Sequence, residues 1–164
     1  RIIIEQQVSV PSAQAILARG AARIPVVTPE IVSAMSEDDL RACGLSGPKI
    51  RYVQGVAGAV LAGELQLDRL PQMDDQAANA HLCAIKGIGP WTAAIYLLFC
   101  EGRVDIWPQG DVALLGAYTA ARRYGRKPVM KELDAKALNW SPWRGLAAHI
   151  LWTYYAHIRG RTPI

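Results

Sequence analysis

The sequence has few cysteines and histidines and no long apolar run. No stretch approaches the roughly 20 apolar residues that cross a bilayer, and no signal-peptide pattern is present, so a membrane protein is not expected. The three cysteines are widely spaced and odd in number, which argues against a disulfide framework or a metal knuckle. The three histidines are also scattered, so nothing resembles a zinc site. We therefore expect a reducing, cytoplasmic compartment.

Signals for β-strands are scarce as well. Only residues 24–27 read as extended, whereas most of the chain carries helix-start signals. The predicted starts are caps at Ser12, Ser36, Asp74 and Asp111, and Ser141-Pro142 before the last helix. With no repeat, low-complexity tract or long linker, the sequence predicts an all-α fold.

Hydrophobic residues make up 51% of the 164 residues, which is enough for one core or for two small helical lobes sharing a cleft. We expect residues 1–164 to form one compact domain of this kind, with the active site in the cleft. Because the sequence opens on Arg1 within an apolar run, we also expect it to begin inside a helix of a longer natural protein.

The net charge of +4 is unevenly distributed. Residues 1–85 hold seven Lys or Arg against nine Asp or Glu, whereas residues 86–164 hold eleven against five. Much of the excess lies in six basic residues of one region: Arg122, Arg123, Arg126, Lys127, Lys131 and Lys136. They could follow a phosphate backbone, and a solvated helix surface is the alternative for each of them.

The most informative motif is a glycine turn at residues 85–94, Ile-Lys-Gly-Ile-Gly-Pro-Trp-Thr-Ala-Ala. Two glycines around one isoleucine allow a tight reversal between helices, and Pro90 suits a first helical position. The amides around the glycines, at the positive end of the next helix, would bind phosphate without reading bases. The candidate phosphate contacts are Lys86, Gly87, Gly89 and Thr92. A helix-to-helix turn without a ligand would look similar, so the motif alone leaves both readings open.

Four segments in order carry a resemblance that covers essentially the whole sequence. They are Glu-Gln-Gln-Val-Ser at residues 5–9, Leu-Arg-Ala-Cys-Gly-Leu at residues 40–45, the glycine turn, and residues 140–152 with Trp-Ser-Pro-Trp-Arg and Ala-Ala-His-Ile-Leu-Trp. The chain resembles the helix-hairpin-helix DNA glycosylase superfamily, and within it the 3-methyladenine DNA glycosylase II branch of alkylation-repair enzymes. The β-rich N-terminal domain of that branch, which some members lack, has no counterpart in the sequence.

The resemblance places the catalytic aspartate at Asp111, at the end of Pro-Gln-Gly-Asp. Release of a base builds positive charge on deoxyribose, and a carboxylate in a poorly hydrated cleft would stabilise that charge and orient or deprotonate water. The alternative is that Asp111 only caps a helix, and both roles can coexist. Asp105 is interpreted as a structural support of the loop. Gly110 stands where members often carry a second acidic residue.

The resemblance also bears on the reaction type. Superfamily members that nick the strand carry a lysine at the position of Trp91, whose amine forms a Schiff base with the sugar. An indole cannot do so. No cysteine follows Cys100, so the iron-sulfur cluster of endonuclease III relatives is not expected either. We therefore predict monofunctional base excision with water as nucleophile and with no required cofactor.

An enzyme of this kind must flip its target nucleotide out of the duplex. By resemblance, the wedge that fills the gap is Gln7, with Val8 the next candidate; an ordinary helix-end amide is the alternative reading of Gln7. Aromatic faces suit an alkylated purine because its ring is cationic. The expected pocket residues are Trp91 and Trp152, with Trp107 and Tyr96 as weaker neighbours. Trp140, Trp143 and His149 are interpreted as packing residues, and Ile95 replaces a second pocket aromatic.

The implied substrate is double-stranded DNA with alkylated bases, 3-methyladenine first and 7-methylguanine or neutral lesions next, bound by a monomer. The family hairpin often holds Na⁺ or K⁺, here at the backbone of Ile85 and Ile88. Two alternatives are a non-enzymatic helix-hairpin-helix module that only binds DNA, and a glycosylase of the same fold for another lesion.

Overall fold

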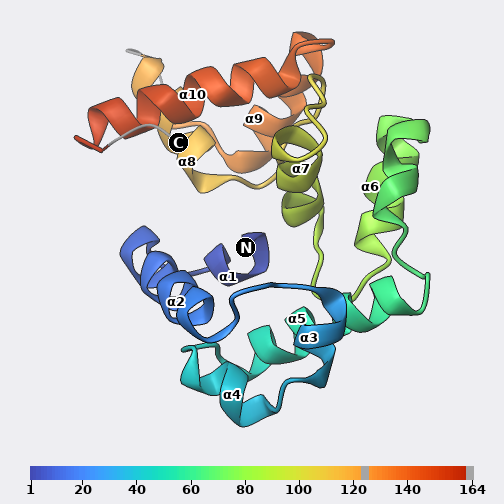
Figure 1. The fold of residues 1–164 in the computed structure, drawn as a ribbon. Coiled ribbons are helices and arrows are strands. Elements are labelled where there is room, and N and C mark those ends of the chain that lie inside the picture. The colour runs from blue at the N-terminus through green and yellow to red at the C-terminus, as the bar shows by residue number, and fades with distance from the viewer. Residues whose placement is uncertain (123–125, 162–164) are drawn as a thin grey trace. The chain divides into compact units, whose positions relative to one another are not determined.

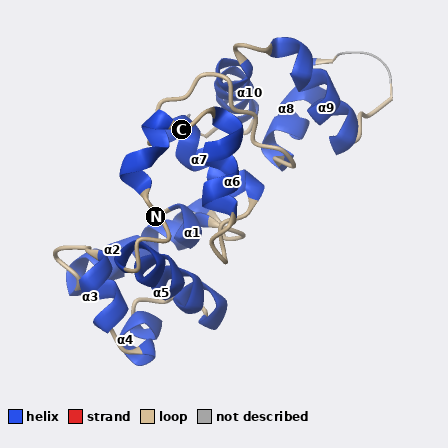
Figure 2. Cartoon of the chain, turned by 90° about the vertical axis from the view of Figure 1, so that its right-hand side faces the viewer, coloured by secondary structure: helices blue, strands red, loops and turns tan. Residues whose placement is uncertain are grey.

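The structure is a computed structural model that describes residues 1–122 and 126–161. The described residues form helices joined by turns and loops and contain no β-strand (Figure 2). The elements are α1 (Ile2–Glu5), α2 (Val10–Arg23), α3 (Pro29–Ala34), α4 (Glu37–Ala42), α5 (Gly47–Leu61), η1 (Leu67–Gln72), α6 (Asp75–Cys83), α7 (Pro90–Phe99), α8 (Val112–Ala121), α9 (Met130–Ala137), η2 (Leu138–Trp140) and α10 (Arg144–Ile158). The all-α prediction is confirmed, and residues 24–27 form a loop rather than a strand.

Among the described helices, none combines the length and the apolar character that crossing a bilayer requires.

The chain divides into two compact units, Arg1–Thr92 and Ala93–Ile164. The first unit holds α1 to α6 and the first turn of α7, coloured blue to yellow-green in Figure 1. The second unit holds the rest of α7 and the elements from α8 to α10.

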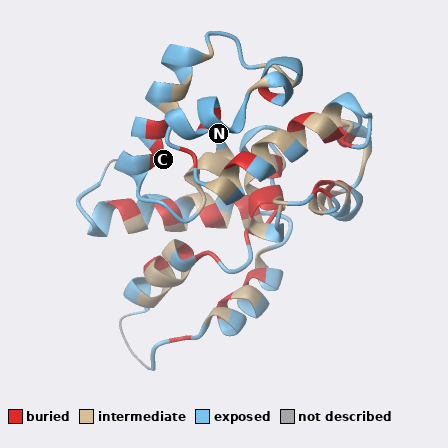
Figure 3. Cartoon of the chain, turned by 90° about the horizontal axis from the view of Figure 1, so that it is seen from below, coloured by how far each residue is buried: buried red, intermediate tan, exposed pale blue. Residues whose placement is uncertain are grey.

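The first unit has its core between α2, α4 and α5. Ile16, Leu40, Cys43, Leu45 and Ile50 form one buried apolar cluster. Further buried residues on the longer helices lie at helical spacing, Ala13 before Ile16 on α2 and Ala57 after Ile50 on α5, so each of these helices turns one face inward and leaves the other in water. Figure 3 shows buried and exposed positions alternating along helices of the chain.

The second unit packs α8 against both α10 and α9 through buried apolar side chains. The buried residues on these helices are Leu114, Ala117, Leu133, Ala137, Ala148, Trp152 and Ala156. Gly116 lets α8 and α10 approach closely, since a Cβ there would lie 2.7 Å from the ring of Tyr155. This packing fixes the two helices that carry Asp111 and Trp152.

Three of the predicted helix starts are correct and two are wrong. Ser36, Asp74 and Asp111 each accept hydrogen bonds from the first turn of the helix that follows. Ser12 lies inside the first turn of α2, and the cap is Ser9, whose hydroxyl accepts from the Ser12 amide. The last helix begins at Arg144 rather than after Ser141.

Candidate active site

The glycine hairpin (residues 85–92) connects α6 to α7. Pro90 is the first residue of α7, as predicted, and the Ile88 amide donates to the Ile85 carbonyl at 3.0 Å. Gly87 has φ 97°, a left-handed conformation that glycine adopts without a Cβ penalty. A Cβ at Gly87 would also lie 2.5 Å from Cγ of Tyr52 on α5. Gly87 is therefore required by the fold itself.

Gly89 is different from Gly87. Its φ lies outside the left-handed region, and apart from its two chain neighbours no described residue has an atom within 4 Å of the position a Cβ would take. Neither the backbone nor the packing of the described chain requires glycine here. The missing side chain leaves open space in front of the start of α7, beside the exposed Lys86, where an anion could approach.

Thr92 lies in the first turn of α7 with its side chain buried. Its hydroxyl oxygen accepts a hydrogen bond from the Gln6 amide at 2.7 Å, and the same nitrogen donates to the Gly87 carbonyl at 3.3 Å. The Thr92 hydroxyl thus has a protein partner in this structure, and its role as a phosphate contact stays a prediction. The contact with Gln6 was not expected from the sequence.

The predicted wedge residues lie in a sharp corner between α1 and α2, which we call the wedge corner (residues 6–9). Gln7 has φ 53°, an uncommon conformation for a residue other than glycine. Its side chain and that of Val8 are both exposed. Unusual backbone conformations concentrate at functional sites, so the geometry favours a role for this corner without testing it.

Asp111 caps α8 and is buried, with 8% of its surface exposed. Its Oδ1 accepts from the amides of Ala113 at 2.8 Å and Leu114 at 2.9 Å. Its Oδ2 accepts from the indole nitrogen of Trp152 at 3.3 Å. The preceding residue, Gly110, has φ 80°, a left-handed conformation that glycine adopts without a Cβ penalty. The carboxylate is held from two sides at the positive end of a helix.

Trp152 brings a predicted pocket aromatic beside the predicted catalytic carboxylate. Its ring lies 5.8 Å from that of Phe99 and 5.7 Å from that of His149. His149 also packs edge-on against Phe99 at 4.9 Å, which confirms its interpretation as a packed histidine. Within the second unit, Asp111 and Trp152 are the predicted site residues that the structure joins by a hydrogen bond.

The other predicted pocket residues have different surroundings. Trp107 is buried, its indole nitrogen donates to Asp134 at 2.9 Å, and its ring meets that of Trp140 at 5.4 Å. Tyr96 is half-buried on α7. Its pKa is raised, mainly by burial and to a smaller extent by the nearby Cys100 and Glu101. Trp91 is half-buried at the start of α7 in the first unit. Their roles in a base pocket stay predictions.

Trp140 packs against Trp107 and Tyr118, as interpreted from the sequence. The packing interpretation of Trp143 is wrong, because 58% of its surface is exposed. It is the N-cap residue of α10.

Asp105 supports the chain that leads into α10, which confirms its structural interpretation. Its carboxylate accepts from the backbone amide of Arg144 at 3.1 Å and from two guanidinium nitrogens at 2.8 and 2.9 Å. The Ser141 hydroxyl donates to it at 2.7 Å. The hydrogen bonds from Arg144 lower the pKa of Asp105 to about 2, more than burial raises it.

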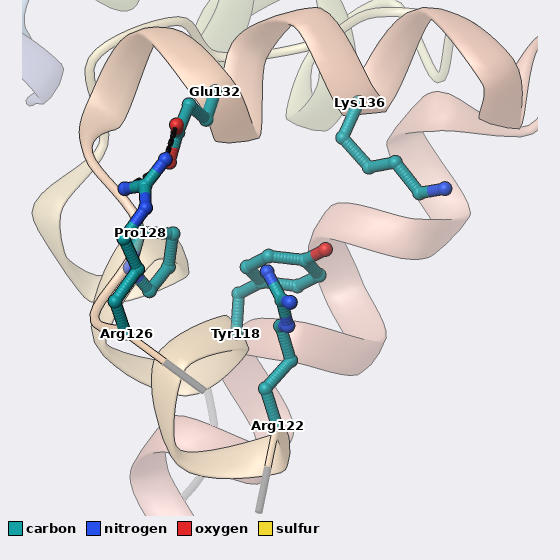
Figure 4. Close-up of a pocket in the computed structure, with 6 residues that line it drawn as sticks. All are labelled: Tyr118, Arg122, Arg126, Pro128, Glu132 and Lys136. Atoms are coloured by element: carbon teal, nitrogen blue, oxygen red, sulfur yellow. Dashed lines mark hydrogen bonds and ion pairs between the residues drawn. The ribbon is translucent and has the colours of Figure 1, made fainter. Parts of the chain in front are cut away.

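Three of the predicted basic residues line one hollow of about 470 Å³ between α8 and α9 (Figure 4). Its lining residues are Tyr118, Arg122, Arg126, Pro128, Glu132 and Lys136. Arg126 pairs with Glu132, and the Arg122 guanidinium lies 5.8 Å from the centre of the Tyr118 ring. Lys136 forms no ion pair with any residue of the described ranges. Arg123 lies outside the described residues.

Comparisons with known proteins agree with this arrangement. Residues 1–143 match the family model described as HhH-GPD superfamily base excision DNA repair protein. The chain is 31% identical to a DNA-3-methyladenine glycosylase of Bacillus subtilis over 123 residues, which are 75% of this chain and 41% of that protein. The chain thus spans about two fifths of that relative's length.

Solved structures share the fold as well. A DNA-3-methyladenine glycosidase from Bacillus halodurans has a TM-score of 0.82 and 31% identity, over 96% of this chain and 74% of that one. A 3-methyladenine DNA glycosylase from Schizosaccharomyces pombe in complex with abasic DNA has a TM-score of 0.84 and 26% identity, over 96% of this chain and 77% of that one. The family works on DNA, within the cell. The family model covers most of the sequence, so the chain belongs to the HhH-GPD superfamily of base excision DNA repair proteins.

Proposed function

We propose that the chain is a monofunctional DNA glycosylase that removes alkylated purines from double-stranded DNA, with 3-methyladenine as the first substrate and 7-methylguanine as a second. The observation that carries the proposal is the carboxylate of Asp111, buried at the start of α8 with the indole of Trp152 at 3.3 Å. Relatives named for the same activity support it.

The proposed mechanism depends on charge that appears only in the transition state. As the bond between base and deoxyribose breaks, positive charge grows on the sugar, and a fixed carboxylate stabilises it. Three N–H donors to Asp111 keep the carboxylate in place, so we assign it mainly to charge stabilisation and to orienting water. An alkylated purine is already cationic and leaves without a dedicated acid.

Water is the proposed nucleophile. Trp91 offers no amine to attack the sugar, so the product would be an abasic site in an intact strand. We propose that the protein is a monomer and acts in the cytoplasm of a bacterial-type cell, where the DNA lies.

The remaining predicted residues receive roles in binding. The amides around Gly87 and Gly89, with Lys86, would bind one phosphate, and Gln7 would fill the space that the flipped nucleotide leaves. The basic residues of the α8–α9 hollow would add weaker phosphate contacts.

No cofactor is proposed. A monovalent cation at the carbonyls of Ile85 and Ile88 is compatible with the hairpin. The Ile85 carbonyl already accepts from the Ile88 amide, which leaves one lone pair for a cation.

The test is release of methylated bases from alkylated duplex DNA by the unaltered chain, Asp111→Asn and Asp74→Asn. Asp74 is a matched control because it also caps a helix, α6, but is exposed. We expect loss of about 100-fold or more in Asp111→Asn, from the general size of such electrostatic effects, and no loss in Asp74→Asn.

Three outcomes would contradict parts of the proposal. Equal release by Asp111→Asn and the unaltered chain would remove Asp111 from catalysis. Tight binding of damaged duplex without release would favour a binding module. Release of oxidised guanine or mismatched adenine, with methylated bases left in place, would assign a different lesion.

A further inference from the structure

Gln6 connects two segments that lie far apart in the sequence. Its side-chain nitrogen carries two hydrogens and donates to the Gly87 carbonyl at 3.3 Å and to the Thr92 hydroxyl oxygen at 2.7 Å. Both acceptors belong to the glycine hairpin, whereas Gln6 itself is the first residue of the wedge corner. One amide group therefore joins the two elements to which the proposed function assigns phosphate binding and nucleotide flipping.

Helix α5 supports the same two segments from another side. Lys49 donates to the carbonyl of Ile4, at the end of α1, at 2.5 Å. Tyr52 lies against Gly87, close enough that a Cβ there would overlap its ring. Residues three apart on a helix face the same way, so Lys49 and Tyr52 form one surface under both segments.

The contact lies immediately before the exposed residue that would enter DNA. α1 ends at Glu5, Gln6 has an extended ψ of 130°, and Gln7 then turns into the left-handed region. A left-handed residue other than glycine persists only where its surroundings hold it. With Gln6 anchored to the hairpin, the exposed side chain of Gln7 starts from a fixed position relative to Gly87 and Gly89.

We propose that Gln6 is a positioning residue that sets the spacing between the wedge and the phosphate grip. The inference rests on the proposed function. A strand held at the hairpin would then meet the wedge at one distance, so that binding energy at the phosphate is converted into extrusion of the nucleotide. Small errors in such spacing reduce rates much more than they reduce affinity.

A hydrogen bond with only a structural role would behave differently. Its loss would lower the melting temperature and would reduce affinity and rate together, because less folded protein would be present. A positioning role predicts a split between the two readouts. Affinity depends on phosphate contacts that remain, whereas flipping depends on the spacing that is lost.

The experiment compares Gln6→Met, Thr92→Val and their combination with the unaltered chain. Gln14→Met, at an exposed glutamine of α2, controls for the residue exchange. Affinity is measured on duplex with a tetrahydrofuran abasic analogue, and flipping by the fluorescence of 2-aminopurine beside the lesion site. Base release from methylated duplex is measured at saturating enzyme, and melting temperatures are recorded for every variant.

We expect Gln6→Met to flip and release bases about tenfold more slowly, with affinity within about threefold of the unaltered chain. Thr92→Val should act in the same direction, and the combination should add little, because both remove one link. Gln14→Met should match the unaltered chain.

Flipping by Gln6→Met within twofold of the unaltered chain would overturn the proposal, as would equal losses of affinity and rate that follow the melting temperature. Failure of the proposed function is separately visible: the unaltered chain would release no methylated base, while the fluorescence of unreacted DNA would still report on Gln6.

Discussion

Replacement of Asp111 by asparagine should destabilise the second unit through one identifiable hydrogen bond. Oδ1 accepts from two backbone amides, so the asparagine oxygen must take its place to keep the cap. Asparagine caps helices about as well as aspartate, and this part of the exchange should cost little. The asparagine NH₂ then faces the indole nitrogen of Trp152, which is also a donor. Rotating the amide would only move the conflict to the cap.

The magnitude follows from burial. Trp152 has 6% of its surface exposed, so its N–H would lose its acceptor without full access to water. A buried donor left without a partner costs about 1–3 kcal/mol. For a domain of this size, each kcal/mol lowers the melting temperature by about 2–4 °C, so we expect a fall of about 2–12 °C.

A double-mutant cycle isolates this term. Trp152→Phe removes the indole donor and leaves an aromatic ring among Phe99 and His149. In that background, Asp111→Asn should cost less than about 0.5 kcal/mol, giving a coupling of about 1–3 kcal/mol by chemical denaturation. An equal cost of Asp111→Asn in both backgrounds would refute the reasoning, because the indole would then not be the group that distinguishes the two side chains.

Four further predictions concern the pair Gly87 and Gly89, and then Asp105, Gln7 and Lys136. Gly87→Ala should lower the free energy of unfolding by about 1–3 kcal/mol, because Gly87 has a left-handed φ and lies against the Tyr52 ring. Gly89→Ala should leave the free energy of unfolding within about 1 kcal/mol yet weaken duplex binding about tenfold. Equal losses of stability in the two variants would contradict this difference. The pKa of Asp105 lies at about 2, below its ordinary value of 3.8. The ionised carboxylate therefore adds about 1–2 kcal/mol to the free energy of unfolding above pH 4, and this stabilisation is lost as the pH falls towards 2. Acid titration of Asp105→Asn, corrected for its lower starting stability, should lack this step. Gln7→Gly should keep or raise stability by up to about 1 kcal/mol in thermal melts and slow nucleotide flipping, and faster flipping would remove Gln7 as the wedge. Lys136→Gln should reduce the salt dependence of duplex binding by about one unit of slope, and an unchanged slope would exclude the hollow from DNA contact.

Local signals in the sequence were sufficient for the elements that depend on neighbouring residues. Ser36 and Asp74 were correctly assigned as caps because a cap involves only the next three residues. Asp111 was found as a helix start for the same reason. The prediction of Ser12 as a cap was wrong by about one helical turn. Two serines there could each cap α2, and the residue that does so is Ser9.

Contacts between distant residues could not be read in this way. Ser141 looks like a helix start in the sequence, but in the fold its hydroxyl donates to the distant Asp105 and α10 begins at Arg144. The sequence does not distinguish the partners of Trp107 and Trp152. Only the fold shows that the indole of Trp107 donates to Asp134 and that of Trp152 to Asp111. Gln6 stands next to the expected wedge, but nothing along the chain indicates that its amide reaches Thr92.

The two glycines of the hairpin should respond differently to selection for stability and to selection for DNA repair. In a library screened only for expression and thermal resistance, position 87 should retain glycine, whereas position 89 should accumulate alanine and serine. A screen for repair in living cells should restore glycine at 89. The ratio of glycine frequencies at position 89 between the two screens would measure how strongly the ligand, rather than the stability of the polypeptide, determines the sequence of the turn.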